Sequence, residues 1–398
     1  MHGDCGRKLD QPKYWGWIVV LADFFCLFLI AGTVRSTGIF YDEWMEYFDD
    51  ASSVTSTIGA MTGAVACLAG PIANTLATRF GTRPVVISGG ISSRSQYTYL
   101  SFRYQCSFFL LGFGLALVYI PMLTVPLYYF KERPSLVIGI ASTGIGVGGM
   151  VLPTILKYLI EAYSWRGVAI IMSATMLNIC VCGAVVRPLQ EAEENRPDAP
   201  ITAHGNVASG VACSDNTNIA GFFVLLGHLT SAVIDVGGVS DIKGAYALTV
   251  LNGGSLAGAL ITGFTLYRFP KIDVLFVIIV QTTVCGALLI LIPFVSSTYN
   301  LLLAVCFVAG FTLNPYDYLL QLVYKDMVGL ADVTLAVSIS WASFGIGAIA
   351  GPAIAGFVYD MTGDYANSLY IAGLVILLRE WCLSSLPCHF WAFCNRKA

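Results

Sequence analysis

The chain has 398 residues, of which 57% are hydrophobic and 11% charged, and its mean hydropathy is +0.74. Soluble domains carry about a quarter charged residues, so this composition excludes an ordinary water-soluble protein and indicates a chain embedded in lipid. The formal net charge of −3 offers no basic surface for phosphates, which excludes a nucleic-acid partner.

Hydrophobic runs long enough to cross a bilayer occur along the first half of the chain. A helix needs about 20 mostly apolar residues to span the hydrocarbon core. The runs that meet this condition cover residues 15–40, 52–77, 106–130, 136–160 and 167–186. A further span is expected at 84–104, but this stretch carries Arg94 and ends at Arg103, which makes it a poor membrane helix. Three interpretations of this stretch remain: a marginal span, a re-entrant segment or an altered segment.

A polar stretch then divides the chain. Residues 188–218 are rich in Pro, Gly and Ser and show no apolar period, so we expect a linker there. The hydrophobic runs after it cover residues 219–239, 245–267, 274–295, 301–323, 333–359 and a weaker stretch from 368 onward. The predicted fold class is therefore an all-α membrane protein of twelve helices in two six-helix bundles, with a doubtful third helix.

The basic residues predict the orientation, because Lys and Arg accumulate in cytoplasmic loops of membrane proteins. With twelve spans, one side receives the basic residues at positions 7, 8, 13, 79, 83, 131, 133, 187, 196, 268, 271, 325, 396 and 397. The first loop on the other side, YDEWMEYFDDASS, is acidic. Omitting the third span would move every later loop to the opposite side of the membrane and destroy this distribution of basic residues, so we expect twelve spans. The expected division is a cytoplasmic N-terminus at 1–14, helical bundles at 15–187 and 219–391, a cytoplasmic linker at 188–218 and a cytoplasmic tail at 392–398.

Three motifs resemble a known family. RFGTR at residues 79–83 is similar to the Gly- and Arg-containing loop of the major facilitator superfamily. WGWIVVLADFF at 15–25 and YFKERPSLVIGIASTG at 129–144 resemble the first helix, and the fourth loop with the fifth helix, of the monocarboxylate transporter family. Lys13 and Tyr14 depart from that family's acidic residue and glycines. The resemblance implies a twelve-helix major facilitator fold, transport by alternating access about a midplane site, and a plasma-membrane location.

Arg35 is the main candidate for solute binding. It lies late in the first span, where the resemblance implies a lysine that meets the substrate carboxylate. An arginine can hold a carboxylate with two hydrogen bonds, and a charge inside a span costs about 2.5 to 3.5 kcal/mol unless something compensates it. The alternative is that Arg35 reaches out to the membrane interface. Asn252, Asn314 and Asp317 are the expected substrate-binding residues of the second half.

Other polar residues inside the spans have less defined roles. His228 and Asp235 share a helical face and form a candidate polar relay, whereas Asp23 is too far along its helix to pair with Arg35. The resemblance also implies an acid and an arginine in the eighth span that couple protons to carboxylate. This chain has Ser255 and Ala259 at those positions, which argues against proton symport of the lactate type.

The expected function is secondary-active or facilitative transport of a small monocarboxylate or related organic solute. The alternative is a transporter-like sensor or scaffold that moves no solute. No HExxH, GxSxG or clustered acid–base pair occurs, so an enzyme is not expected. Many cysteines lie in apolar runs, so neither a metal site nor a cofactor is expected. The expected partners are the bilayer and a small organic anion or neutral solute; a coupled proton and an accessory single-span subunit are left open.

Overall fold

The computed structural model describes residues 13–48, 62–100, 104–130, 132–187, 241–295, 298–362 and 365–385, and these ranges contain helices and no strand. The helices of the first part are α1 (Lys13–Phe48), α3 (Gly70–Phe80), α4 (Thr82–Leu100), α5 (Tyr104–Tyr129) and α6 (Pro134–Val185). Helical residues 62–68 lead into α3. The helices of the second part are α9 (Asp241–Arg268), α10 (Val274–Val295), α11 (Tyr299–Val328), α12 (Val333–Thr362) and α13 (Tyr365–Ser385).

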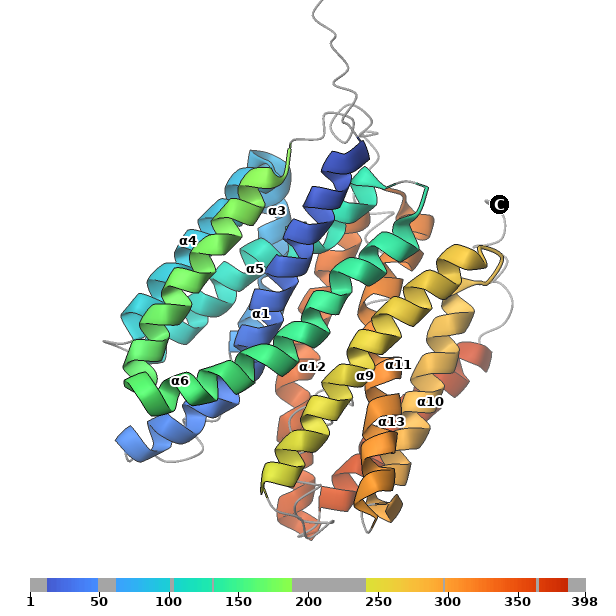
Figure 1. Cartoon of the computed structure of the whole chain (residues 1–398). Coiled ribbons are helices and arrows are strands. Elements are labelled where there is room, and N and C mark those ends of the chain that lie inside the picture. Colours follow the sequence, from blue (N-terminus) through green and yellow to red (C-terminus); the bar gives the residue numbers. More distant parts are fainter. Residues whose placement is uncertain are drawn as a thin grey trace, which may run out of the picture.

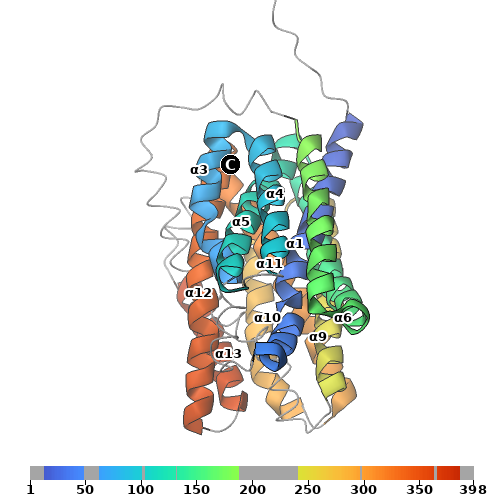
Figure 2. The same cartoon turned by 90° about the vertical axis from the view of Figure 1, so that its left-hand side faces the viewer.

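The helices gather into two groups, which lie side by side in Figure 1 and run roughly parallel in Figure 2. In the first group α6 packs on α1 and α4, and in the second α11 packs on α9 and α10. We call these groups the first half and the second half. The expected span at 219–239, the linker at 188–218 and the two chain ends lie outside the described residues, so the division into domains stays a prediction.

Seven helices in the described ranges are long and apolar enough to cross a membrane. They include the 52-residue α6, which contains the two spans expected at 136–160 and 167–186. The doubtful third span does form a helix, α4, but it is not among the seven. It packs inside the first half: Gly89 lies against α5 and Gly90 against Cys180 of α6. Close packing by protein neighbours lets a helix this polar remain in the bundle.

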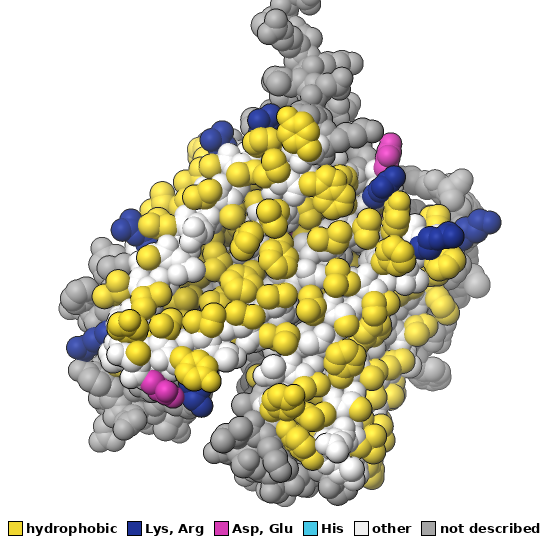
Figure 3. Space-filling view, viewed as in Figure 1, with side chains coloured by type: hydrophobic (Ala, Val, Ile, Leu, Met, Phe, Trp, Pro, Cys, Tyr) yellow, Lys and Arg dark blue, Asp and Glu magenta, His cyan; other side chains and the backbone are white. Residues whose placement is uncertain are grey.

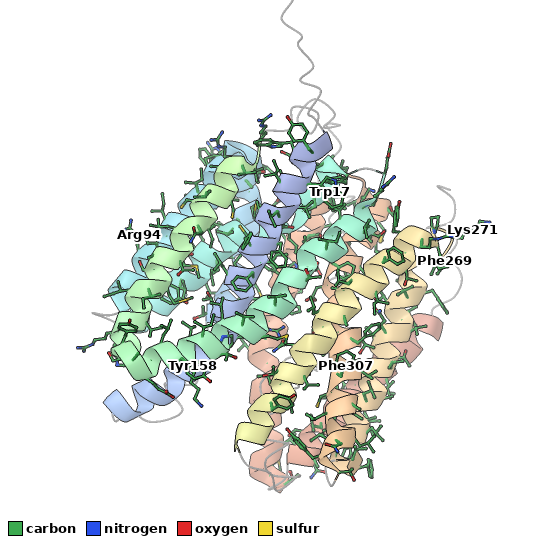
Figure 4. The ribbon with its side chains drawn as sticks, in the orientation of Figure 1. Trp17, Arg94, Tyr158, Phe269, Lys271 and Phe307 are labelled. Atoms are coloured by element: carbon green, nitrogen blue, oxygen red, sulfur yellow. The ribbon has the colours of Figure 1, made fainter. Side chains whose placement is uncertain are left out.

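The outer surface is that of a protein solvated by lipid. Large apolar side chains such as Phe264, Phe276 and Phe294 are more than half exposed, and hydrophobic side chains cover most of the face in Figure 3, with the charged ones at its edges. Among the residues labelled in Figure 4, Trp17 lies near the end where α1 begins and Tyr158 near the opposite end. Aromatic side chains favour the two membrane interfaces, so the helices cross the bilayer along this direction.

Contacts between the two halves concentrate at the end of the molecule where α1 begins. Thr334 of α12 hydrogen-bonds with Tyr128 and Thr124 of α5, at 2.9 and 3.1 Å between the hydroxyl oxygens. Nearby, a Cβ on Gly139 of α6 would lie 3.1 Å from the Cα of Gly263 of α9. At the opposite end Figure 3 shows a hollow between the halves. The two halves are therefore closed against each other at one end of the molecule.

The two spans within α6 meet at Ser164, whose φ of 56° and ψ of 167° interrupt the helix. This backbone region is nearly exclusive to glycine and costs another residue about 1 to 3 kcal/mol. Ser164→Gly is therefore expected to raise the melting temperature of the detergent-solubilised protein, with a gain of about 1 kcal/mol. Ser164→Ala removes the hydroxyl but keeps the backbone cost, so it should give no gain. Equal melting temperatures for the Gly and Ala variants would contradict the strained conformation.

Candidate functional site

Arg35 lies on α1 and turns toward the interior of the protein. Its side chain passes directly over Gly149 of α6: a Cβ at Gly149 would lie 2.7 Å from Cδ and 2.9 Å from Nη1 of Arg35. A side chain at position 149 would displace the guanidinium from this place. The Nη1 atom is buried and has no hydrogen-bond partner among the described residues. These contacts place the Arg35 charge inside the bundle, which argues against the alternative that it reaches out to the membrane interface.

Asn252 of α9 meets the same glycine from the second half. It is 1% exposed, and its Nδ2 donates a long hydrogen bond of 3.4 Å to the carbonyl oxygen of Gly149. Its Oδ1 is buried without a partner in the described part of the chain. Two of the predicted site residues, Arg35 and Asn252, are thus brought together from opposite halves at Gly149.

Asp317 of α11 supplies the opposite charge. Its carboxylate and the Arg35 guanidinium attract each other electrostatically, and Tyr119 of α5 interacts with both. Burying a cation and an anion near one another offsets part of the cost of removing each from water. Arg35, Tyr119 and Asp317 come from three helices and two halves, so this electrostatic interaction crosses the interface between the halves.

Asp317 also lines a small pocket between one face of α11 and one face of α12. The pocket wall consists of Tyr316, Asp317, Leu320, Gln321, Tyr324, Val337, Ser340, Trp341 and Phe344. Its volume of about 10 Å³ has room for about one water molecule. Trp341 closes it toward the first half, where its ring contacts that of Tyr119 edge to face with centroids 4.7 Å apart. A solute can enter this pocket only when the helices around it move.

The described structure gives no side-chain position for the other predicted site residues. Asn314 lies in α11, but its side chain falls outside the described structure, and His228 and Asp235 lie wholly outside it. Asp23 is 1% exposed within the first half, where it interacts with Cys182 of α6. The role proposed for each of these residues therefore stays a prediction.

The two positions of the expected proton-coupling pair are occupied by tightly packed small residues. The Ser255 hydroxyl donates to the carbonyl oxygen of Leu251 in its own helix, at 3.2 Å. Ala259 is fully buried, its carbonyl oxygen accepts a 3.1 Å hydrogen bond from the Tyr318 hydroxyl, and the same oxygen would lie 2.9 Å from a Cβ at Gly139. Because Ala259 is fully buried, the packing leaves no room for an arginine side chain at position 259.

Three residues of this site were not predicted from the sequence. Tyr119 and Trp341 come from different halves, and no spacing along the chain indicates that their rings meet. Gln321, by contrast, follows Asp317 by four positions on α11, and residues four apart share a helical face. That spacing could have identified Gln321 as a neighbour of the predicted acid.

Comparisons with known proteins agree with this architecture. The Major Facilitator Superfamily profile matches residues 24–314. Monocarboxylate transporter 13 of Bos taurus is 31% identical over 391 residues, which cover 95% of this chain and 91% of the relative. Monocarboxylate transporter 11 of Homo sapiens is 29% identical, over 94% of this chain and 83% of the relative.

Solved structures show the same fold at low sequence identity. The E. coli fucose:proton symporter matches 92% of this chain and 98% of its own, with a TM-score of 0.67 and 14% identity. The proton:xylose symporter XylE matches 94% of this chain and 96% of its own, with a TM-score of 0.71 and 12% identity. The chain is thus a multi-pass membrane transport protein rather than an enzyme, and it belongs to the monocarboxylate transporter family of the major facilitator superfamily.

Proposed function

We propose that the protein carries a small monocarboxylate or a related organic solute across the membrane by alternating access. Arg35 is the anion anchor, and Asn252, Asn314 and Asp317 complete the solute site from the second half. The observation that carries this proposal is the Arg35 side chain that lies over Gly149 inside the bundle, with a buried Nη1 that has no partner among the described residues. A carboxylate supplies the charge and the paired acceptors that a guanidinium binds best.

The arrangement of the two halves supports a rocking mechanism. Thr334, Tyr128 and Thr124 close one end through hydrogen bonds between side chains, which can break and re-form without disturbing either half. Closing the opposite end around a bound solute while these bonds open would expose the site to the other side of the membrane. The charge pair of Arg35 and Asp317 is separated or rearranged by the same movement.

The orientation follows from the charges at the closed end. Arg133, Arg187, Arg268 and Lys271 lie at the helix ends on this side, and basic residues favour the cytoplasmic face. We therefore propose that the closed end faces the cytoplasm and that both termini lie on that side. The plasma membrane is the proposed location.

We also propose that Asp317 couples transport to protons by competing with the solute for Arg35. Proton symport is named for the two solved structures similar to this chain. Arg35, Tyr119 and Cys67 are the described groups that interact electrostatically with Asp317. Protonation of Asp317 removes its attraction for Arg35, which then binds a solute carboxylate more strongly. Uptake should consequently rise at acidic external pH.

Asp317→Asn is the variant that tests this coupling, because it holds the side chain permanently neutral. Carboxylate uptake by the variant at neutral pH is expected to approach the wild-type rate at acidic pH, and its acid-to-neutral ratio should fall to about 1. Labelled uptake in cells at two external pH values measures this ratio. An unchanged pH dependence in the variant, at equal surface expression, would assign the proton to another group.

The transport proposal as a whole is tested by uptake across a panel of carboxylates, amino acids and neutral metabolites in cells that express the chain. Saturable uptake of at least one carboxylate is the expected result. Binding of these solutes without flux would instead favour a sensor or scaffold and reject the carrier.

A further inference from the structure

Gln321 presents an unused hydrogen-bonding group to the pocket beside Asp317. Its side chain is fully buried, at 0% exposed, and it forms part of the pocket wall. Both Nε2 and Oε1 are buried with no hydrogen-bond partner in the described part of the chain. An amide in this position can donate two hydrogen bonds and accept others, and leaving it unpaired is costly to the fold.

The amide nitrogen distinguishes Gln321 from Gln281, the other buried glutamine in the described part of the second half, whose Oε1 is likewise unpaired. Gln281 of α10 donates a 2.9 Å hydrogen bond from Nε2 to the hydroxyl of Thr262 in α9. That bond joins two helices of one bundle and explains why Gln281 is buried. Gln321 makes no such bond among the described residues, so its place in the wall calls for a partner that enters the pocket.

The groups around Gln321 define what that partner is. Arg35, which interacts electrostatically with Asp317 of the pocket wall, is the proposed anchor for a carboxylate, whereas the neutral amide binds a group that both donates and accepts a hydrogen bond. The rings of Tyr316, Trp341 and Phe344 form the apolar part of the same wall, and such walls bind apolar or aromatic bodies. A solute with a carboxylate, a neutral polar substituent and an apolar body satisfies all three.

We propose that Gln321 contacts the solute and sets specificity by binding a hydroxyl or amide substituent on an apolar carboxylate. This assignment rests on the proposed transport function and deepens it: the preferred solutes are substituted carboxylates rather than plain fatty acids. A site that hydrogen-bonds a substrate hydroxyl rejects the analogue that lacks it, because the amide is then left unpaired.

The test compares matched solutes that differ only in a hydroxyl group, 3-phenyllactate with 3-phenylpropionate and lactate with propionate. Wild-type protein in cells is expected to take up the hydroxylated member of at least one pair with a kcat/KM about 10-fold or more higher. In Gln321→Leu this preference should fall to about 2-fold or less, while uptake of the deoxy member persists. Gln281→Leu is the matched control and should keep the wild-type preference.

Thermal unfolding separates a solute contact from a structural role. Gln321→Leu removes an unpaired amide, so its melting temperature in detergent should equal or exceed that of the wild type, whereas Gln281→Leu breaks a hydrogen bond and should melt lower. A marked loss of stability in Gln321→Leu would assign the amide to the fold and overturn the inference. Equal uptake of both members of each pair by the wild type, or an unchanged preference in Gln321→Leu, would also overturn it. Uptake of no carboxylate at all would reject the transport proposal itself, which is a different result.

Discussion

Arg35→Ala is expected to reduce carboxylate uptake about 30-fold or more, because removing the cation that binds a carboxylate inside the bundle costs about 2 to 5 kcal/mol and about 1.4 kcal/mol corresponds to a factor of ten. The loss has two parts. The solute carboxylate loses the cation that binds it, and Asp317 loses its electrostatic attraction to Arg35 and repels an incoming carboxylate. Uptake of a labelled carboxylate, corrected for the amount of protein at the cell surface, measures the effect.

Arg35→Lys tests whether the solute needs only the positive charge of Arg35 or also the planar geometry of its guanidinium. A lysine keeps the positive charge but lacks the planar fork that holds a carboxylate with two hydrogen bonds, so we expect intermediate uptake. Lys157→Ala is the control, since Lys157 is an exposed cation on α6 away from Gly149 and should transport normally. Wild-type rates in Arg35→Ala would remove Arg35 from the solute site.

Gly254→Ala is expected to destabilise the second half. A Cβ at Gly254 of α9 would collide with the carbonyl oxygen of Phe307 on α11 and lie 3.0 Å from the backbone nitrogen of Phe311. Phe307 is labelled in Figure 4. Because the obstacles are backbone atoms, the two helices must separate to admit the methyl group, at a cost of about 1 to 3 kcal/mol or more.

The neighbouring Gly253 gives a matched control. A Cβ there would meet nothing within 4 Å, so Gly253→Ala introduces the same methyl group into open space and gains up to about 1 kcal/mol of helix propensity. The melting temperature of the solubilised protein should fall in Gly254→Ala and hold or rise in Gly253→Ala. Equal losses in both variants would mean that helix contact at Gly254 is not the cause.

The sequence predicted the helices well because hydrocarbon imposes a strong length and polarity requirement on each span. The run at 274–295 coincides with α10, Val274–Val295. The third span was doubtful on hydropathy, and α4 is indeed too polar to stand among the seven apolar helices. The third span is nevertheless predicted, because the basic loops fall on one side of the membrane only if every span is present.

The site was only partly predictable, and the reason is geometric. Arg35 and Asp317 were found because a charge in an apolar run is conspicuous in the sequence. That they interact electrostatically across the two halves, and that Tyr119 interacts with both, depends on packing between segments almost 300 residues apart. The role of Gly149 was also hidden: the sequence shows a glycine suited to close packing, and the structure shows that it makes room for the arginine.

Counterflow in proteoliposomes tests whether the two helical halves rock about a solute held by Arg35. Purified protein is reconstituted with a carboxylate from the uptake panel inside the vesicles, and entry of the labelled form is measured. Alternating access predicts that the internal solute accelerates entry in the wild type and that Arg35→Ala abolishes the acceleration. Flux that is indifferent to internal solute would indicate a continuous pore, and solute binding with no flux would indicate a receptor; either result would contradict the account.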